Sequence, residues 1–300
     1  MDRRLLLQAL GGLCAGALCN AGSAQSPRVM TKKIPSTGEA LPVIGVGTWQ
    51  TFDAGADAAA RAPLREVLKL LNGNVVDSSP MYGSSETVAG DLIADLGMRD
   101  KLFMATKVWT SGRDEGIRQM ETSFKRLRAE RMDLMQVHNL TDVATQTETL
   151  KQWKQEKRVR YIGITHYTSS AYGSVERWLK TKEYDFLQIN YSLGERDSEK
   201  RILGIAKDLG VAVIINRPFA EGALFRRVKG KPLPPWAAEL GIESWAQYFL
   251  KWIVSHPAVT CAIPGTGNPA HMKDNLGAGR GALPDAAARK RMSEYFDAQG

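Results

Sequence analysis

The sequence contains very little cysteine, three residues in 300: Cys14, Cys19 and Cys261. The first two fall in an amino-terminal segment that we expect to be removed, so Cys261 would be the one thiol of the mature chain and no disulfide could form within it. The fold must then rest on its hydrophobic core. Hydrophobic residues make up 43% of the chain, which is enough for one large core.

Histidine is also scarce, and charge of one sign does not dominate. The four histidines include no His-x-His pair. A metal-dependent barrel hydrolase is therefore a weak alternative and we expect no metal, although His138 and His166 would lie on neighbouring strand ends. The net charge of +8 comes from Lys and Arg residues that are spread along the chain with acids between them. This pattern argues against a nucleic-acid partner and favours anionic small molecules.

Residues 1–24 have the composition of an export signal. Arg3 and Arg4 precede an apolar segment at 9–21, and small residues follow up to Ala24. The apolar segment is too short and too rich in glycine for a stable membrane span. The paired arginines resemble a twin-arginine signal, which predicts export of the folded protein to the periplasm by that machinery; an ordinary secretory signal is the alternative. Residues 25–300 would form a single domain.

The rest of the chain alternates between strand and helix patterns. A β-hairpin is predicted where residues 30–34 and 40–43 flank a polar turn. Short apolar runs then recur, with apolar residues at helical spacing between them. The eight runs are 43–47, 75–77, 102–107, 133–138, 161–165, 186–190, 211–216 and 259–263. Such strands indicate an α/β fold of the (β/α)8 TIM-barrel type. An open doubly wound sheet is the alternative, but residues 45–49 lack the third glycine of its phosphate loop.

Two additions interrupt this alternation. A long loop is predicted over residues 220–235, followed by an amphipathic helix over 244–254. A last helix, 285–296, follows the eighth unit. The expected fold is therefore a TIM barrel with an N-terminal β-hairpin and two extra helices.

Four polar residues occupy the carboxyl ends of successive predicted strands, where the catalytic groups of barrel enzymes lie. Asp77 ends the second strand, Lys107 the third and His138 the fourth, and Tyr82 lies in the loop after the second. Each alone is commonly a cap, a surface residue or a core residue. Four of them at one end of a barrel indicate an active site.

The chemistry of the four residues predicts a proton-transfer set. A tyrosine with a pKa near ~10 is a poor acid or base at neutral pH, and a lysine ammonium ~4 Å away supplies about 4 kcal/mol toward lowering that pKa. Asp77 would keep a buried Lys107 charged, and His138 would hold a carbonyl oxygen near Tyr82. The set contains no nucleophile, so hydride from a nicotinamide cofactor fits the other half of the reaction.

These residues resemble the catalytic tetrad of the aldo-keto reductase family, which are NAD(P)H-dependent carbonyl reductases on TIM barrels. Asp77, Tyr82, Lys107 and His138 match the family's Asp, Tyr, Lys and His, with the same step of five residues from Asp to Tyr. Residues 45–49, 161–164 and 263–265 match further motifs, and the resemblance extends from about residue 30 to residue 277.

The resemblance also implies cofactor contacts, to NADPH in preference to NADH. Thr165 and His166 stand where the family has a Ser-Asn pair for the nicotinamide carboxamide, and Gln188 matches a third amide partner. Asn216 replaces the tyrosine that stacks on the nicotinamide, so a stacking surface is lost, and Arg217 follows it. The implied contacts are Thr48, Asp77, Thr165, His166, Gln188, Asn216, Arg217, Pro218, Thr266, His271 and Asn275.

The predicted function is reduction of an aldehyde or ketone to an alcohol, with Tyr82 as proton donor and a small carbonyl compound as substrate. The alternative is a nucleotide-binding sensor or partner subunit on the same fold with little turnover. The departure from the family at Asn216 keeps that alternative open.

Overall fold

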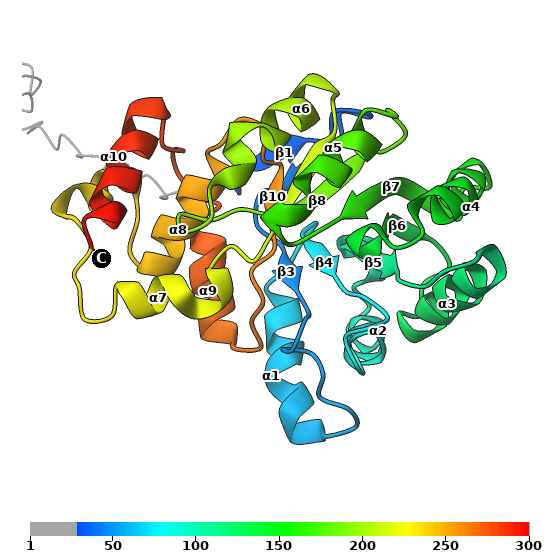
Figure 1. Cartoon of the computed structure of the whole chain (residues 1–300). Helices are drawn as coiled ribbons and strands as arrows, with labels where there is room; N and C mark the ends of the chain where they lie inside the picture. Colours follow the sequence, from blue (N-terminus) through cyan, green and yellow to red (C-terminus); the bar gives the residue numbers. More distant parts are fainter. Residues whose placement is uncertain (1–28, 300) are drawn as a thin grey trace, which may run out of the picture.

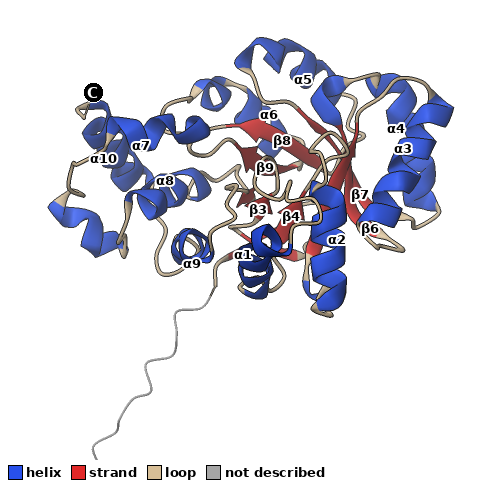
Figure 2. Ribbon diagram, turned by 90° about the horizontal axis from the view of Figure 1, so that it is seen from below, coloured by secondary structure: helices blue, strands red, loops and turns tan. Residues whose placement is uncertain are grey.

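The structure, a computed structural model, describes residues 29–299, so the predicted export signal lies outside the described residues. Eight parallel strands form a barrel that is surrounded by helices (Figures 1 and 2). Neighbouring strands follow chain order, and bridges from Ile44 to Ala262 and from Gly47 to Gly265 join the first strand to the last. The strands are β3 (Val46–Gly47), β4 (Val75–Asp77), β5 (Phe103–Val108), β6 (Met132–Val137), β7 (Val159–Thr165), β8 (Phe186–Asn190), β9 (Ala212–Asn216) and β10 (Cys261–Ala262). The predicted TIM barrel is confirmed.

Helices follow the strands, as the apolar spacing predicted. The first begins after Asp57, whose carboxylate accepts hydrogen bonds from two backbone N–H groups of the first turn. The helices between and after the strands are α1 (Ala58–Lys69), α2 (Ser85–Asp95), α3 (Arg113–Arg126), α4 (Val143–Gln155), α5 (Tyr172–Leu179), α6 (Ile202–Asp208), α8 (Trp245–Val254) and α9 (Pro269–Gly277). Short 3-10 turns are η1 (Arg99–Lys101), η2 (His138–Leu140), η3 (Ser169–Ala171), η4 (Asp197–Lys200), η5 (Ala220–Gly222) and η6 (Pro235–Leu240).

The predicted hairpin closes the amino-terminal end of the barrel. Its strands β1 (Thr31–Lys33) and β2 (Ala40–Pro42) pair in antiparallel fashion. Ile34 and Leu41 are buried in one cluster with residues from inside the barrel. The hairpin therefore shields the barrel interior from solvent at the end opposite the predicted active site.

Side chains on each strand alternate between two separate cores. In β4, Val75 belongs to the cluster inside the barrel, whereas Val76 belongs to the larger cluster between strands and helices. In β5, Phe103 and Ala105 point inward and Met104 outward. This alternation fixes which residues at the strand ends face the barrel axis.

The additions after the seventh and eighth units are largely as predicted. Helix α8 and a last helix, α10 (Ala286–Asp297), are confirmed, and each is capped by a side chain, from Ser244 and Asp285. The prediction of a continuous loop over residues 220–235 is wrong, because that segment contains α7 (Ala223–Arg227), whose Leu224 is buried in the main core. Of the helices in residues 29–299, none is long and apolar enough to cross a membrane.

Candidate active site

The polar residues of the candidate site share one position in the alternation of their strands. Counting in steps of two from the inward-facing Val75, Phe103, Leu134 and Tyr161 leads to Asp77, Lys107, Gln136 and Thr165. The same count from Phe186 and Ala212 leads to Gln188 and Asn216. The barrel interior is thus apolar toward the amino ends of the strands and has a polar layer at their carboxyl ends.

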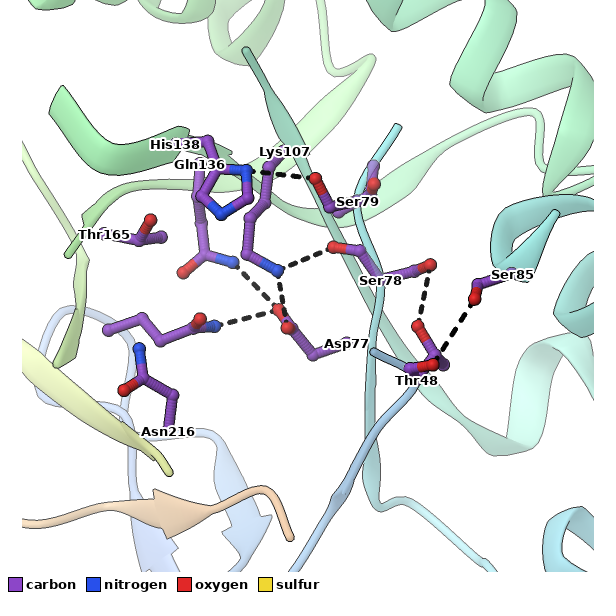
Figure 3. A network of polar contacts seen from close by, with 12 residues as sticks. Thr48, Asp77, Ser78, Ser79, Ser85, Lys107, Gln136, His138, Thr165 and Asn216 are labelled. Carbon is purple, nitrogen blue, oxygen red and sulfur yellow. Dashed lines mark hydrogen bonds and ion pairs between the residues drawn. The ribbon is translucent and has the colours of Figure 1, made fainter. Parts of the chain in front are cut away.

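A buried ion pair forms the centre of this polar layer (Figure 3). Lys107 is fully buried, and its Nζ donates to Asp77 Oδ2 at 2.6 Å and to the Ser78 carbonyl at 2.7 Å. The other carboxylate oxygen of Asp77 accepts from Gln136 Nε2 at 3.1 Å and from Gln188 Nε2 at 2.9 Å. Burial works against the charged form of Lys107, but the charge of Asp77, helped by Tyr82, outweighs it and raises the lysine pKa. The ammonium therefore stays charged in the interior.

Tyr82 lies beside this pair, in the turn between β4 and α2. Its ring centroid is 5.0 Å from Lys107 Nζ and 5.9 Å from the ring centroid of His138, with the two rings edge to face. The expectation of a lowered tyrosine pKa is wrong: burial raises the pKa of Tyr82, and the opposing charge of Lys107 does not cancel it. The resting phenol is therefore neutral, which is the state that can donate a proton.

His138 also lies next to Tyr82, and it is neutral as well. Strand β6 ends at Val137, one residue earlier than predicted, and His138 begins η2. Its Nδ1 lies 3.0 Å from Ser79 Oγ. Burial, the charge of Lys107 and the electrostatic effect of His166 together lower the pKa of His138 to about 2. A neutral imidazole can present one N–H donor to a bound oxygen.

The residues expected to contact a nicotinamide carboxamide lie at neighbouring strand ends. Thr165 is buried, and its Oγ1 accepts from the backbone N–H of Asn139 at 3.2 Å. Asn216 donates through Nδ2 to the carbonyl oxygen of His166 at 3.0 Å. The ring of His166 accepts at Nδ1 from the backbone N–H groups of Tyr167 and Thr168. Only its Nε2–H remains for a ligand, so His166 can donate but not accept.

Two buried amide oxygens of this layer carry no hydrogen-bond partner within residues 29–299. They are Gln136 Oε1 and Asn216 Oδ1. The amide nitrogens fix the orientation of both side chains, because Gln136 Nε2 donates to Asp77 and Asn216 Nδ2 donates to the His166 carbonyl. Unpaired buried acceptors are costly unless a donor reaches them. The amide N–H₂ of a nicotinamide carboxamide is such a donor, so these residues fit that group.

Two of the predicted cofactor contacts, Arg217 and Pro218, already have partners or cover within the protein. Arg217 donates to the Tyr167 carbonyl at 3.3 Å, and its guanidinium lies 3.4 Å from a carboxylate oxygen of Glu221 and 3.9 Å from one of Glu195. Its side chain also lies over the exposed ring of Tyr167, which stacks on His166. Pro218 is buried. The arginine is thus partly neutralised by two acids that sequence reasoning did not associate with it.

The remaining predicted contacts lie on two other segments. Thr48 is fully buried and donates to Ser78 Oγ at 2.9 Å, so its hydroxyl supports the strand end of Asp77. Thr266 and Asn275 are buried, and His271 is exposed on the first turn of α9. Asn268 caps this helix by accepting from the backbone N–H groups of Ala270 and His271.

Sequence reasoning missed Gln136, Ser79 and Asn268. A signal was available for each of them. Gln136 is an amide in an otherwise apolar strand and lies two residues before His138, on the same face. Ser79 lies between Asp77 and Tyr82, and Asn268 precedes a proline at the first position of a helix. No cluster of three or more potential metal ligands occurs among the residues that the structure describes.

The fold and the site together define a (β/α)8 barrel with a buried polar site at the carboxyl end of its strands. The aldo/keto reductase family model matches residues 43–290, and the chain belongs to the aldo/keto reductase family. It is an oxidoreductase of the aldo-keto reductase type.

Individual relatives are similar along most of their length. Methylglyoxal reductase YeaE of Escherichia coli (strain K12) is 28% identical over 258 residues, which cover 81% of this chain and 88% of that protein. An aldo/keto reductase from Klebsiella pneumoniae, solved in complex with NADP and acetate, matches with a TM-score of 0.72 and 25% identity over 86% of this chain and 93% of that chain. Another from the same organism, in complex with NADPH, has a TM-score of 0.74 at 24% identity, over 90% of this chain and 95% of that one, and supports the fold.

Proposed function

We propose that this protein reduces an aldehyde or ketone to an alcohol with NADPH, and that Tyr82 donates the proton. The observation that carries the proposal is the neutral Tyr82 phenol beside the fully buried Lys107–Asp77 pair. The chemistry that a nicotinamide supplies when it is bound is hydride donation to the carbonyl carbon. The oxygen then needs a proton, which Tyr82 would give.

Each member of the set has a distinct role in this proposal. Tyr82 transfers its proton to the alkoxide oxygen, and the charged Lys107 stabilises the phenolate that remains. Asp77 holds the Lys107 ammonium in place and charged. His138 donates a hydrogen bond to the carbonyl oxygen and aligns it with the Tyr82 hydroxyl.

The cofactor would be held from two sides. Thr165, His166, Gln188 and Asn216 would hold the carboxamide by hydrogen bonds, in which the unpaired Asn216 Oδ1 and Gln136 Oε1 act as acceptors. Thr266, His271, Asn275 and the N-terminus of α9 would contact the phosphates and the adenine. Thr48, Arg217 and Pro218 would support these contacts from behind, since Thr48 and Pro218 are buried and Arg217 is paired with acids. The complexes of the two Klebsiella pneumoniae proteins with NADP and NADPH favour NADPH here.

The substrate would be a small carbonyl compound with an apolar substituent. Trp49, Met81 and Trp109 are exposed large hydrophobic residues in loops at the carboxyl end of the barrel. Met81 precedes Tyr82, and the ring of Trp109 lies 6.5 Å from that of His138. Apolar surface beside a proton donor favours substrates that bury an alkyl or aryl group there.

Tyr82→Phe tests the proposal, because it removes the phenolic O–H and little else. We expect carbonyl reduction to fall by about 10²–10⁴-fold, while NADPH still binds in a fluorescence titration. Tyr184→Phe is the matched control, since its hydroxyl bonds to Thr147 in the outer layer of the fold; it should retain activity. A sensor or partner subunit with little turnover would instead show negligible reduction in the wild type and unchanged NADPH binding in Tyr82→Phe.

We further propose that residues 1–24 direct export and that residues 25–300 function as one domain in the periplasm. The support is the sequence pattern of Arg3-Arg4, the apolar segment and the small residues before Ala24. Twin-arginine export would carry a protein that had already folded around its nucleotide. Cell fractionation with N-terminal sequencing tests this: a cytoplasmic protein that keeps residue 1 would contradict it, and an Arg3→Lys/Arg4→Lys variant should fail to be exported.

A further inference from the structure

Ser79 connects the two residues that would face a substrate oxygen. It is fully buried in the turn between β4 and Tyr82. Its carbonyl oxygen accepts from the backbone N–H of Tyr82 at 3.1 Å, and its Oγ accepts from the backbone N–H of Met81 at 3.4 Å. A serine with these two bonds stabilises the turn that presents Tyr82.

The same serine hydroxyl also contacts His138. Ser79 Oγ lies 3.0 Å from Nδ1 of the imidazole (Figure 3). The ring is neutral, because burial and the charge of Lys107 lower the pKa of His138 to about 2. A neutral imidazole carries its proton on one nitrogen only, so the bond to Ser79 decides whether a donor or a lone pair faces the substrate.

Counting donors and acceptors around the hydroxyl selects one arrangement. Among the residues that the structure describes, Nδ1 of His138 is the one acceptor within hydrogen-bond distance of Ser79 Oγ, because the other contact, the Met81 N–H, is itself a donor. A proton on Nδ1 would leave the buried serine O–H without an acceptor, which is unfavourable. The hydroxyl must therefore donate to Nδ1.

We propose that Ser79 is a positioning residue which, by donating to Nδ1, keeps the proton of His138 on Nε2. The Nε2–H then points away from Ser79 and donates to the carbonyl oxygen of the substrate. One residue thereby supports the turn that carries Tyr82, through its backbone carbonyl and its hydroxyl, and sets the His138 tautomer through its hydroxyl alone. This inference rests on the proposed function, since it gives the Nε2–H its acceptor.

Nitrogen NMR of the imidazole in the substrate-free full chain tests the tautomer directly. The chain has four histidines, so a His138→Asn variant assigns the signal. We expect Nδ1 of wild-type His138 to resonate as an unprotonated, pyridine-like nitrogen and Nε2 as a protonated one. In Ser79→Ala this preference should shift toward a mixture of tautomers. Ser78→Ala removes an equally buried hydroxyl that accepts from Thr48 and should leave the His138 signals unchanged.

The kinetic consequence separates positioning from binding. Ser79→Ala should lower kcat by about five- to tenfold, the effect of one lost hydrogen bond. The dissociation constant for NADPH should stay the same, because Ser79 lies across His138 from Thr165 and Asn216 (Figure 3). Ser79→Thr retains the hydroxyl and should restore most of the wild-type tautomer and kcat.

Two results would overturn the assignment. One is a protonated Nδ1 in the wild type, and this measurement needs no variant that might fail to fold. The other is an unchanged tautomer in a folded Ser79→Ala protein. The proposed function fails by a different result, namely retained carbonyl reduction in Tyr82→Phe, which leaves the tautomer of the resting protein unaffected.

Discussion

Replacing Lys107 by methionine should destabilise the fold, because the buried Asp77 carboxylate would lose its countercharge. Methionine has nearly the length of lysine but cannot donate to Asp77 Oδ2 or to the Ser78 carbonyl, which Lys107 Nζ contacts at 2.6 and 2.7 Å. Both members of the pair are almost inaccessible, with side-chain exposures of 0% for Lys107 and 3% for Asp77. Solvent therefore cannot replace the lost ammonium.

The size of the effect follows from the burial of the pair. Removing one partner of a buried ion pair costs about 3–5 kcal/mol. Asp77 would keep the amide donors of Gln136 and Gln188, so we expect the lower end, ~3 kcal/mol. For a domain of this size that corresponds to a fall in Tm of roughly 5 °C. Asp77→Asn in the same chain removes the unpaired charge and should recover about 2 kcal/mol of the loss.

Urea unfolding of the wild type, the single variant and the double variant measures these differences. Lowering the pH from 7 to 5 should shrink the deficit of Lys107→Met, because protonation relieves an uncompensated buried carboxylate. Lys251→Met is the control: Lys251 is equally buried but donates to the carbonyl oxygens of Leu240, Arg280 and Ala282. Its deficit should not change over this pH range. A loss below ~1 kcal/mol for Lys107→Met, or a double variant no more stable than the single one, would refute the reasoning.

Two further predictions concern pH and packing. Burial, the charge of Lys107 and the electrostatic effect of His166 together lower the pKa of His138 to about 2. Below pH ~6.5 the unfolded chain therefore binds a proton at His138 that the folded chain does not bind. The free energy of unfolding should thus fall with falling pH. In urea unfolding between pH 6 and 4.5, His138→Asn should make this fall less steep by ~1.4 kcal/mol per pH unit. The same slope in the variant and the wild type would contradict the lowered pKa. Gly90→Ala should destabilise by about 1–3 kcal/mol, since the new Cβ would lie 2.1 Å from the Arg126 carbonyl oxygen. Gly204→Ala, with nothing within 4 Å, should stabilise by about 0.4–1 kcal/mol, and thermal melts in the opposite order would exclude this account.

The barrel and its four central residues could be predicted because both depend on local pattern. Alternation of apolar runs and helical spacing identifies the strands, and the strand ends then bring Asp77, Lys107 and His138 to one face. Counting in steps of two along β6 from Leu134 would also have found Gln136 on the inward face. Helix α7 was missed because it has only five residues, too few to show a periodic apolar pattern. It is held by the burial of Leu224 in the core, which is a tertiary contact.

The properties of the site that depend on distant segments could not be predicted. The pKa of Tyr82 rises because the burial of the phenol outweighs the opposing charge of Lys107, and the sequence shows the neighbouring charge but not the burial. Arg217 was predicted as a cofactor contact, yet Glu195, 22 positions earlier in the chain, and Glu221 lie within ion-pair distance of it. Such pairings follow from how the loops of β8 and β9 meet.

The junction between β3 and β10 closes the barrel, and the segment that follows β10 is the one expected to bind the nucleotide. It consists of isolated bridges between residues near 45 and residues near 263, so it carries the largest loop-closure entropy in the barrel and should be among the last contacts to form. Short ladders of this kind are also where native proteins open first. Because residues 263–275 leave the barrel directly at this junction, a ligand held there adds its binding free energy to the closed state. Slower amide hydrogen exchange at Gly45 and Ala262, whose N–H groups bond across the junction, would then report nucleotide occupancy without any turnover.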